Sequence, residues 1–322
     1  MPETSRSNLK AALIALCSFA LFATHDVVVK YLGATYSPFQ IIFFSVLLSF
    51  PLATVMLMRD ATAGTLRPVH PWWTALRTAA AVLTASSAFY AFSVLPLAQV
   101  YAILFATPLL ITVLAIPILR ERVGPHRWFA VLLGLAGVLV VLRPGAAPFE
   151  TGHLAALVAA LGSATSSVVV RKIGRAERSA VLMLYPMVAN FLMMAAFLPM
   201  VYVPMPLAHL GLMGIVSILA FFAGLCIIAA YRRGDAAVVA PMQYSQILWA
   251  AGYGILIFDE VGDPSTWVGA GIVMLSGLYI VLRERSVGAS KNTPVLKSGR
   301  RYVSGAGAQI DMVEREPKTE SG

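Results

Sequence analysis

Ten apolar runs of about twenty residues each occupy most of the chain and leave it few ways to fold. The hydrocarbon core of a bilayer is about 30 Å thick, and about 20 helical residues cross it while satisfying their own backbone hydrogen bonds. The runs therefore predict an all-α integral membrane protein. We place its ten transmembrane helices at residues 9–32, 38–58, 72–94, 98–118, 126–143, 152–172, 180–203, 208–230, 237–257 and 265–283.

The composition agrees with a chain that lies in lipid. Of its 322 residues, 59% are hydrophobic and 12% are charged, against about 25% charged in a typical soluble domain. The net charge of +9 follows from topology, because with a cytoplasmic N-terminus every Lys and Arg except Lys30 and Arg143 falls on the cytoplasmic side, as the positive-inside rule requires. We predict a multi-pass protein of the cell inner membrane with both termini cytoplasmic, whose partner is the lipid bilayer and not nucleic acid.

The last part of the chain, residues 286–322, differs from the rest. It is polar, rich in Ser and Gly, and mixed in charge. Such a segment cannot bury enough apolar surface to offset the entropy lost on ordering. We therefore predict a disordered cytoplasmic tail.

The two halves of the chain repeat one another. An offset of 139 residues matches Glu121 with Glu260 and Trp128 with Trp267, and the stretch 24–30 recurs 141 residues later with Ser in place of Asp and Arg in place of Lys. Each unit holds five helices, an odd number, so the second copy crosses the membrane in the opposite sense. The sequence predicts two inverted five-helix repeats, at residues 9–143 and 152–283.

A short acidic turn precedes the closing Trp helix of each repeat, at residues 120–125 and again at 259–264. With ten helices in two units, these turns resemble the drug/metabolite transporter superfamily, and both halves are similar to EamA-type domains over residues 9–283. The resemblance implies a carrier of small organic metabolites with a cavity between its halves. It is nearest to bacterial members that carry riboflavin or S-adenosylmethionine. Riboflavin is the first substrate expected, with S-adenosylmethionine, amino acids, drugs and other metabolites as alternatives, imported or exported.

Two charged residues, Asp26 and Lys30, interrupt the first apolar run. Each costs roughly 2.5–3.5 kcal/mol at mid-bilayer, so both are expected to face the bundle interior. Their spacing of four places them on one helical face, where they can pair. Two interpretations stay open: Asp26 is a substrate ligand or proton carrier with Lys30 as its partner, or the two form a structural salt bridge with Lys30 reaching the interface. We expect His25 to point to a different face.

Polar and aromatic side chains gather in the ninth predicted helix, more densely than a lipid-facing helix favours. The candidate substrate-binding residues there are Gln243, Tyr244, Gln246 and Trp249. The repeat pairs this stretch with Tyr101 and Phe105 of the fourth helix, which we expect on the opposite wall. Hydrogen-bonding groups beside rings suit a planar solute. Interfacial anchoring or bonding between helices is the alternative, and Glu121 and Glu260 are expected to cap helix starts.

These observations favour a secondary transporter that works by alternating access. No GxxxxGK[ST] motif suggests nucleotide hydrolysis. An intramembrane enzyme acting on lipids is the alternative class, but it needs a clustered catalytic set, whereas the five histidines are scattered and the two cysteines lack CxxC spacing. We therefore predict no catalytic residue, metal or cofactor. The expected partner is a small-molecule substrate, and a homodimer is left open.

Overall fold

The computed structural model describes residues 3–58, 65–121, 123–143, 149–174, 176–233, 236–260 and 262–286, and within these ranges all regular structure is helical. The predicted tail at 286–322 lies almost wholly outside the described residues. The elements are α1 (Glu3–Gly33), α2 (Pro38–Met58), α3 (Pro71–Val94), α4 (Leu97–Leu104), α5 (Thr107–Leu119), α6 (Pro125–Leu142), α7 (Thr151–Ile173), α8 (Ser179–Val201), α9 (Leu207–Arg233), α10 (Ala236–Val239), the 3-10 helix η1 (Ala240–Tyr244), α11 (Ser245–Phe258) and α12 (Pro264–Ser286).

These elements form the ten predicted crossings. Apart from the start of α1, each predicted boundary lies within three residues of an observed one. Seven segments of the described chain are long and apolar enough to span a bilayer, and 264–280 is a shorter apolar helix. The remaining crossings are α3 and the broken segment α10–η1–α11. The prediction of an all-α, ten-helix membrane protein is confirmed.

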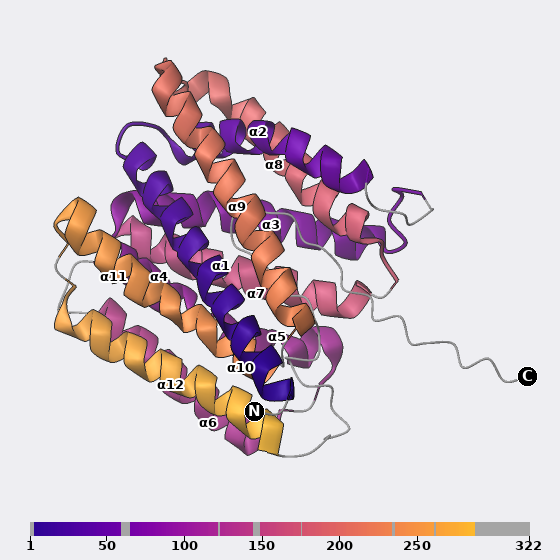
Figure 1. Ribbon diagram of the computed structural model, residues 1–322, viewed down its shortest axis with the longest axis vertical. Coiled ribbons are helices and arrows are strands. Elements are labelled where there is room, and N and C mark those ends of the chain that lie inside the picture. Colours follow the sequence, from indigo (N-terminus) through magenta and orange to yellow (C-terminus); the bar gives the residue numbers. More distant parts are fainter. Residues whose placement is uncertain are drawn as a thin grey trace, which may run out of the picture.

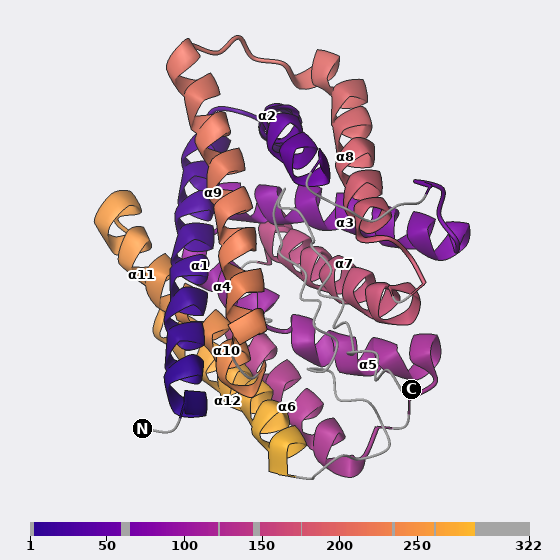
Figure 2. The same ribbon diagram turned by 45° about the vertical axis from the view of Figure 1, so that its right-hand side comes forward.

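The two repeats interlock rather than lie side by side as separate bundles. Helix α1 of the first repeat packs along α9 of the second, and its counterpart α7 packs along α3; α6 lies against α12 on the internal symmetry axis (Figure 1, Figure 2). At this last crossing the backbones nearly touch, since a Cβ on Gly269 would lie 2.6 Å from the carbonyl oxygen of Gly137. The contacts between the repeats therefore occur in equivalent pairs, since the contact of α1 with α9 corresponds through the repeat to that of α7 with α3.

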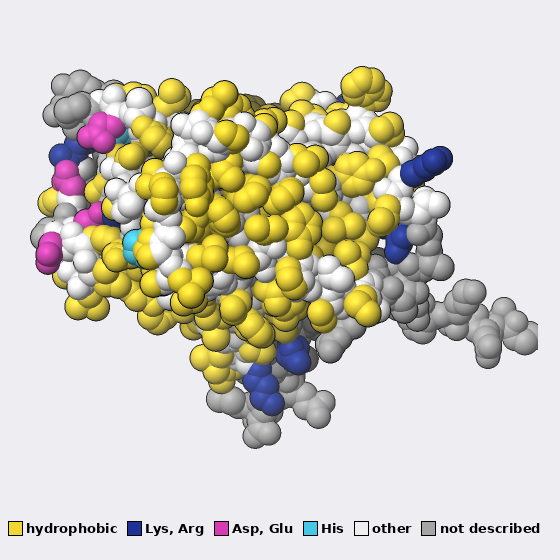
Figure 3. All heavy atoms as spheres, turned by 90° about the horizontal axis from the view of Figure 1, so that it is seen from above, with side chains coloured by type: hydrophobic (Ala, Val, Ile, Leu, Met, Phe, Trp, Pro, Cys, Tyr) yellow, Lys and Arg dark blue, Asp and Glu magenta, His cyan; other side chains and the backbone are white. Residues whose placement is uncertain are grey.

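The outside of the bundle is apolar, and its charges lie at the two ends. Hydrophobic side chains cover most of the face seen in Figure 3, with the acidic ones in view gathered at its left. We name the two ends of the molecule by residues near them. The Lys30 end carries exposed Glu150, Asp259 and Asp263. The Arg171 end carries the exposed basic residues Lys10, Arg67, Arg120, Lys172 and Arg233.

A left-handed residue ends the fourth crossing and, at the equivalent place in the other repeat, the ninth. Arg120 caps α5 with φ of 56° and Asp259 caps α11 with φ of 52°. In each case the N–H of the following glutamate reaches back to the carbonyl six residues earlier, at 3.4 Å for Glu121 and 2.9 Å for Glu260. This cap closes the helix and turns the chain sharply. It therefore fixes both glutamates at corresponding corners of the fold.

Candidate substrate site

The fourth and ninth crossings are each broken near the middle, and the two breaks meet. Phe105 and Ala106 separate α4 from α5, while η1 separates α10 from α11. Pro108 and Pro241 lie beside these breaks and supply no N–H to the helix ladder. Phe105 and Tyr244 occupy matching places in the two repeats, and their ring centroids lie 5.1 Å apart at 86°. The pseudo-twofold axis therefore passes between these rings.

Tyr244 reaches this position because the facing helix, α12, has a glycine there, at Gly277, which we call the notch. A Cβ on Gly277 of α12 would lie 1.8 Å from the Tyr244 hydroxyl oxygen, so only glycine leaves room for the phenol. On the opposite wall, Tyr101 lies beside Phe105 and Phe92, with centroid distances of 6.1 and 5.5 Å. The result is a continuous group of rings contributed by both repeats. The placement of Tyr101, Phe105 and Tyr244 on facing walls is the one expected from the repeat.

Asp26 lies at the edge of this group of rings. Its carboxylate is buried and accepts a hydrogen bond from the Tyr101 hydroxyl through Oδ2. Gln246 of α11 is also buried. Thr24, two residues before Asp26 on α1, is hydrogen-bonded to the Tyr253 hydroxyl at 2.8 Å. These contacts join α1, α4 and α11 around one negative charge.

His25 is also part of this network, contrary to the expectation that it points away. Its Nδ1 lies 2.7 Å from Asp26 Oδ1, and the ring is fully buried in a T-shaped contact with the Phe89 ring. Its Nε2 has no hydrogen-bond partner among the described residues. Adjacent residues of a helix point in directions about 100° apart. The short Asp26 side chain nevertheless bends back far enough to reach the neighbouring His25 ring. The two side chains share one buried polar cluster.

The pair expected between Asp26 and Lys30 does not form. Lys30 Nζ lies 2.7 Å from Glu260 Oε1 and donates to the Leu95 carbonyl at 2.6 Å. The other oxygen of Glu260 accepts the N–H of Leu97, the first residue of α4, at 3.1 Å. Glu260 thus caps a helix start as predicted, but the start belongs to the other repeat. Lys30 turns away because a carboxylate near its own end of the bundle is available.

Trp249 does not line the site. It is 41% exposed and lies on the outer side of α11, next to the more exposed Leu248. The buried face of that helix runs through Gln246, Ile247 and Ala250. Trp249 precedes Ala250 by one residue and is therefore rotated about 100° from it, toward the bilayer. Gln243 is half-buried in η1.

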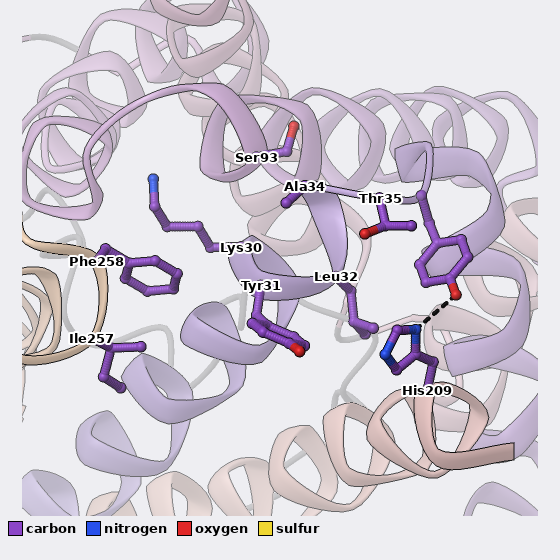
Figure 4. A pocket seen from close by; sticks show the side chains of 10 residues that line it. Lys30, Tyr31, Leu32, Ala34, Thr35, Ser93, His209, Ile257 and Phe258 are labelled. Atoms are coloured by element: carbon purple, nitrogen blue, oxygen red, sulfur yellow. Dashed lines mark hydrogen bonds between the residues drawn. The ribbon is translucent and has the colours of Figure 1, made fainter. Parts of the chain in front are cut away.

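A cavity of about 420 Å³ opens beside Lys30 at the end of α1 (Figure 4). Tyr31, Phe258 and His209 line it, and His209 Nδ1 is hydrogen-bonded to the Tyr36 hydroxyl at 2.7 Å. Sequence reasoning did not select these aromatic residues. Their approach depends on α9 beginning next to the loop after α1, which no local pattern reveals.

A second ion pair lies at the opposite end of the molecule. Arg171, near the end of α7, lies with Nη2 2.5 Å from Glu121 Oε1. Its neighbour Lys172 donates to the Ile118 carbonyl at 2.8 Å and lies 4.0 Å from the centroid of the Trp73 ring. The pair of Arg171 and Glu121 corresponds through the repeat to that of Lys30 and Glu260.

Comparison with known proteins identifies the family. The model of the EamA-like transporter family matches residues 9–143 and again 150–283. The S-adenosylmethionine uptake transporter of Rickettsia prowazekii is 26% identical over 88% of this chain and 98% of its own. The riboflavin transporter of Vibrio cholerae is 30% identical over 58% of this chain and 62% of its own length. The pseudopaline exporter CntI of Pseudomonas aeruginosa is 24% identical over 82% of this chain and 93% of its own length.

A solved crystal structure shares the fold, with a TM-score of 0.56 at 18% identity, covering 89% of this chain and all of its own. The relatives are named for different solutes, so they agree on the class of activity and not on the solute. The chain belongs to the EamA-like transporter family and is a multi-pass membrane transporter of a small metabolite.

Proposed function

We propose that the protein is a secondary transporter of the inner membrane that works by alternating access, with both termini cytoplasmic. The solute binds where the breaks of the fourth and ninth crossings meet, between the two inverted repeats. Discontinuous helices of this kind expose backbone groups and side chains near the bilayer midplane, where transporters of inverted-repeat design hold their solutes. Rocking of the repeats about that site then opens it to each side in turn.

The buried Asp26 carboxylate carries the proposal. Its partners are a hydroxyl and an imidazole, and among the described residues no Lys or Arg pairs with it. A carboxylate without a Lys or Arg partner is costly to bury in a low-dielectric interior, and inside a membrane such residues commonly mark a solute or proton path. A cationic group of the solute, or a proton taken up with it, would compensate Asp26.

Two solutes follow from this chemistry and from the relatives. Riboflavin, the first expected from the sequence, offers a flat ring system for the group formed by Tyr101, Phe105 and Tyr244. S-adenosylmethionine adds positive charges that a carboxylate beside aromatic rings stabilises, through the ion pair and through cation–π contact. Asp26 therefore favours the adenosyl compound, and the rings alone do not separate the two.

Uptake of both radiolabelled compounds into proteoliposomes tests the proposal. We expect the wild-type protein to concentrate at least one of them, faster when an inward proton gradient is imposed. Asp26→Asn keeps the shape and removes the charge, so uptake of S-adenosylmethionine should fall by about 10-fold to 100-fold, since a charged hydrogen bond is worth about 1.5–3 kcal/mol. Uptake of riboflavin should fall less.

Trp249→Ala serves as the matched control, because this side chain lies on the outer side of α11 and removing it leaves the site intact. Uptake by that variant should equal the wild type. The proposal fails if neither compound, nor a broad panel of other metabolites, crosses an intact bilayer. The role given to Asp26 fails if Asp26→Asn transports as well as the wild type.

A further inference from the structure

The ion pairs Lys30–Glu260 and Arg171–Glu121 occupy equivalent positions in the two repeats. Lys30 corresponds to Arg171 at an offset of 141, and Glu121 corresponds to Glu260 at an offset of 139. In each pair the cation comes from the last turns of the first helix of one repeat, and the glutamate follows the left-handed cap in the other repeat. Each pair therefore joins one repeat to the other.

The pairs lie at opposite ends of the molecule and are largely shielded from solvent. Their side chains are 11% and 20% exposed for Lys30 and Glu260, and 8% and 15% for Arg171 and Glu121. A third ion pair between the repeats, Arg143 with Asp263, is by contrast 35% and 49% exposed. Shielded pairs are screened little by salt and are costly to break on one side only. The third pair is the natural reference for an ordinary surface contact.

The pair at the Lys30 end is mechanically tied to the solute site. Glu260 accepts a hydrogen bond from the N–H of Leu97, and Lys30 donates one to the carbonyl of Leu95. Both residues of the pair are therefore hydrogen-bonded to the turn that begins α4. Leu97 lies one helical turn before Tyr101, whose hydroxyl bonds Asp26. Asp26 lies one turn before Lys30 on α1. The solute site and this pair are therefore connected through both α1 and α4.

We propose that Lys30–Glu260 and Arg171–Glu121 are the two gates of the transporter, each holding its own end closed, so that loss of one opens that end and favours closure of the other. The inference rests on the proposed alternating access. A rigid rocking of one repeat against the other lengthens contacts at one end while shortening them at the opposite end. Two equivalent ion pairs across the same interface balance the two conformations, because each contributes to only one closure.

Thiol accessibility tests the gates without any solute. The native thiols are first removed as Cys17→Ser and Cys226→Ser. A reporter is then placed at each end: Ser93→Cys in the cavity wall beside Lys30, and Ala115→Cys on the buried face of α5. Purified protein in lipid nanodiscs exposes both ends to a polar maleimide, and the labelling rate of each reporter is measured.

Lys30→Met and Arg171→Met remove one cation each while keeping most of the side-chain stem. We expect Lys30→Met to raise the labelling rate at Ser93→Cys by about tenfold or more and to lower it at Ala115→Cys, because truncating one partner of a shielded pair leaves the other unpaired. Arg171→Met should do the reverse. Arg143→Met, which breaks the exposed pair, should leave both rates within about twofold of the parent. Exchange of charges, Lys30→Glu with Glu260→Lys, re-forms the ion pair and should restore the parent rates only in part, because the exchanged side chains cannot bond the Leu95 carbonyl and the Leu97 N–H.

Labelling rates that change in opposite directions at the two reporters distinguish a gate from an ion pair that only stabilises the fold. If each substitution raises labelling at both reporters, the pairs only stabilise the fold and the proposal is overturned. Unchanged rates overturn it as well. Reciprocal labelling in a protein that moves no solute would uphold the gates and count against the proposed transport, whereas solute uptake without reciprocal labelling would do the opposite.

Discussion

At the residue scale, Asp26 and Lys30 show how far a charge in an apolar helix can be interpreted from sequence. Their cost in lipid correctly predicts that both turn inward, and Asp26 is indeed buried. Their partners could not be predicted, because Tyr101 lies 75 residues from Asp26 and Glu260 lies in the other repeat. A spacing of four indicates that two side chains can meet, and it does not show that they prefer each other to distant groups.

The hydrogen bond from Tyr101 to Asp26 gives a test of stability at this scale. Tyr101→Phe keeps the ring and leaves a buried carboxylate oxygen without its donor, which costs about 1.5–3 kcal/mol for a charged group. We expect the thermal midpoint of the purified protein to fall by several degrees. Scanning fluorimetry in detergent measures it.

Tyr253→Phe is the matched control for that experiment. It also removes one hydroxyl from the same part of the molecule, but its partner is the neutral Thr24 hydroxyl. The expected loss is smaller, about 0.5–1.5 kcal/mol. Equal losses in the two variants would show that the carboxylate has no special dependence on Tyr101.

At the element scale, helix positions follow from hydropathy, whereas helix breaks do not. Apolar length predicts where the fourth and ninth crossings run, and Pro108 and Pro241 suggest kinks. The sequence does not predict that both crossings open at matching places, with Phe105 against Tyr244. The prolines are not at matching positions themselves, so the symmetry of the breaks is a property of packing. The outward turn of Trp249 has the same cause, since the phase of α11 is set by what it packs against.

The notch at Gly277 gives a prediction for this element. Gly277→Ala places a methyl group 1.8 Å from the present position of the Tyr244 hydroxyl oxygen, so the phenol must leave its place against Phe105. We expect transport to be largely lost while the protein still inserts. Tyr244→Phe in the same chain removes the clashing oxygen and should restore part of the activity.

Gly271→Ala is the control on the same helix, because a Cβ there meets nothing within 4 Å. Alanine favours a helix over glycine by up to about 1 kcal/mol, so this variant should be as active and at least as stable as the parent. Loss of activity in both variants would mean that α12 tolerates no added methyl group, and the notch would then have no particular role.

At the scale of the whole molecule, the repeat explains the architecture and shows where the two halves differ. The contacts between the halves recur in equivalent pairs, α1 with α9 and α7 with α3, and the ion pairs recur at both ends. Asp26 has no acidic counterpart, because its equivalent is Ser167, whose hydroxyl bonds its own helix at the Ser163 carbonyl. A fold with equivalent ion pairs at its two ends and the buried carboxylate of Asp26 beside the central rings is suited to the proposed binding of one solute in two alternating conformations.

The distribution of exposed charge over the two ends leads to the last prediction, the orientation in the membrane. The described part of the Arg171 end carries exposed Arg67 and Lys172, while the Lys30 end carries exposed acids, and basic loops are retained in the cytoplasm. In the thiol-free parent, Tyr202→Cys at the Lys30 end should react with an impermeant maleimide in intact cells. Arg67→Cys at the Arg171 end should react only after permeabilisation. The reverse pattern would invert the assigned orientation, and the outer gate would then be Arg171–Glu121.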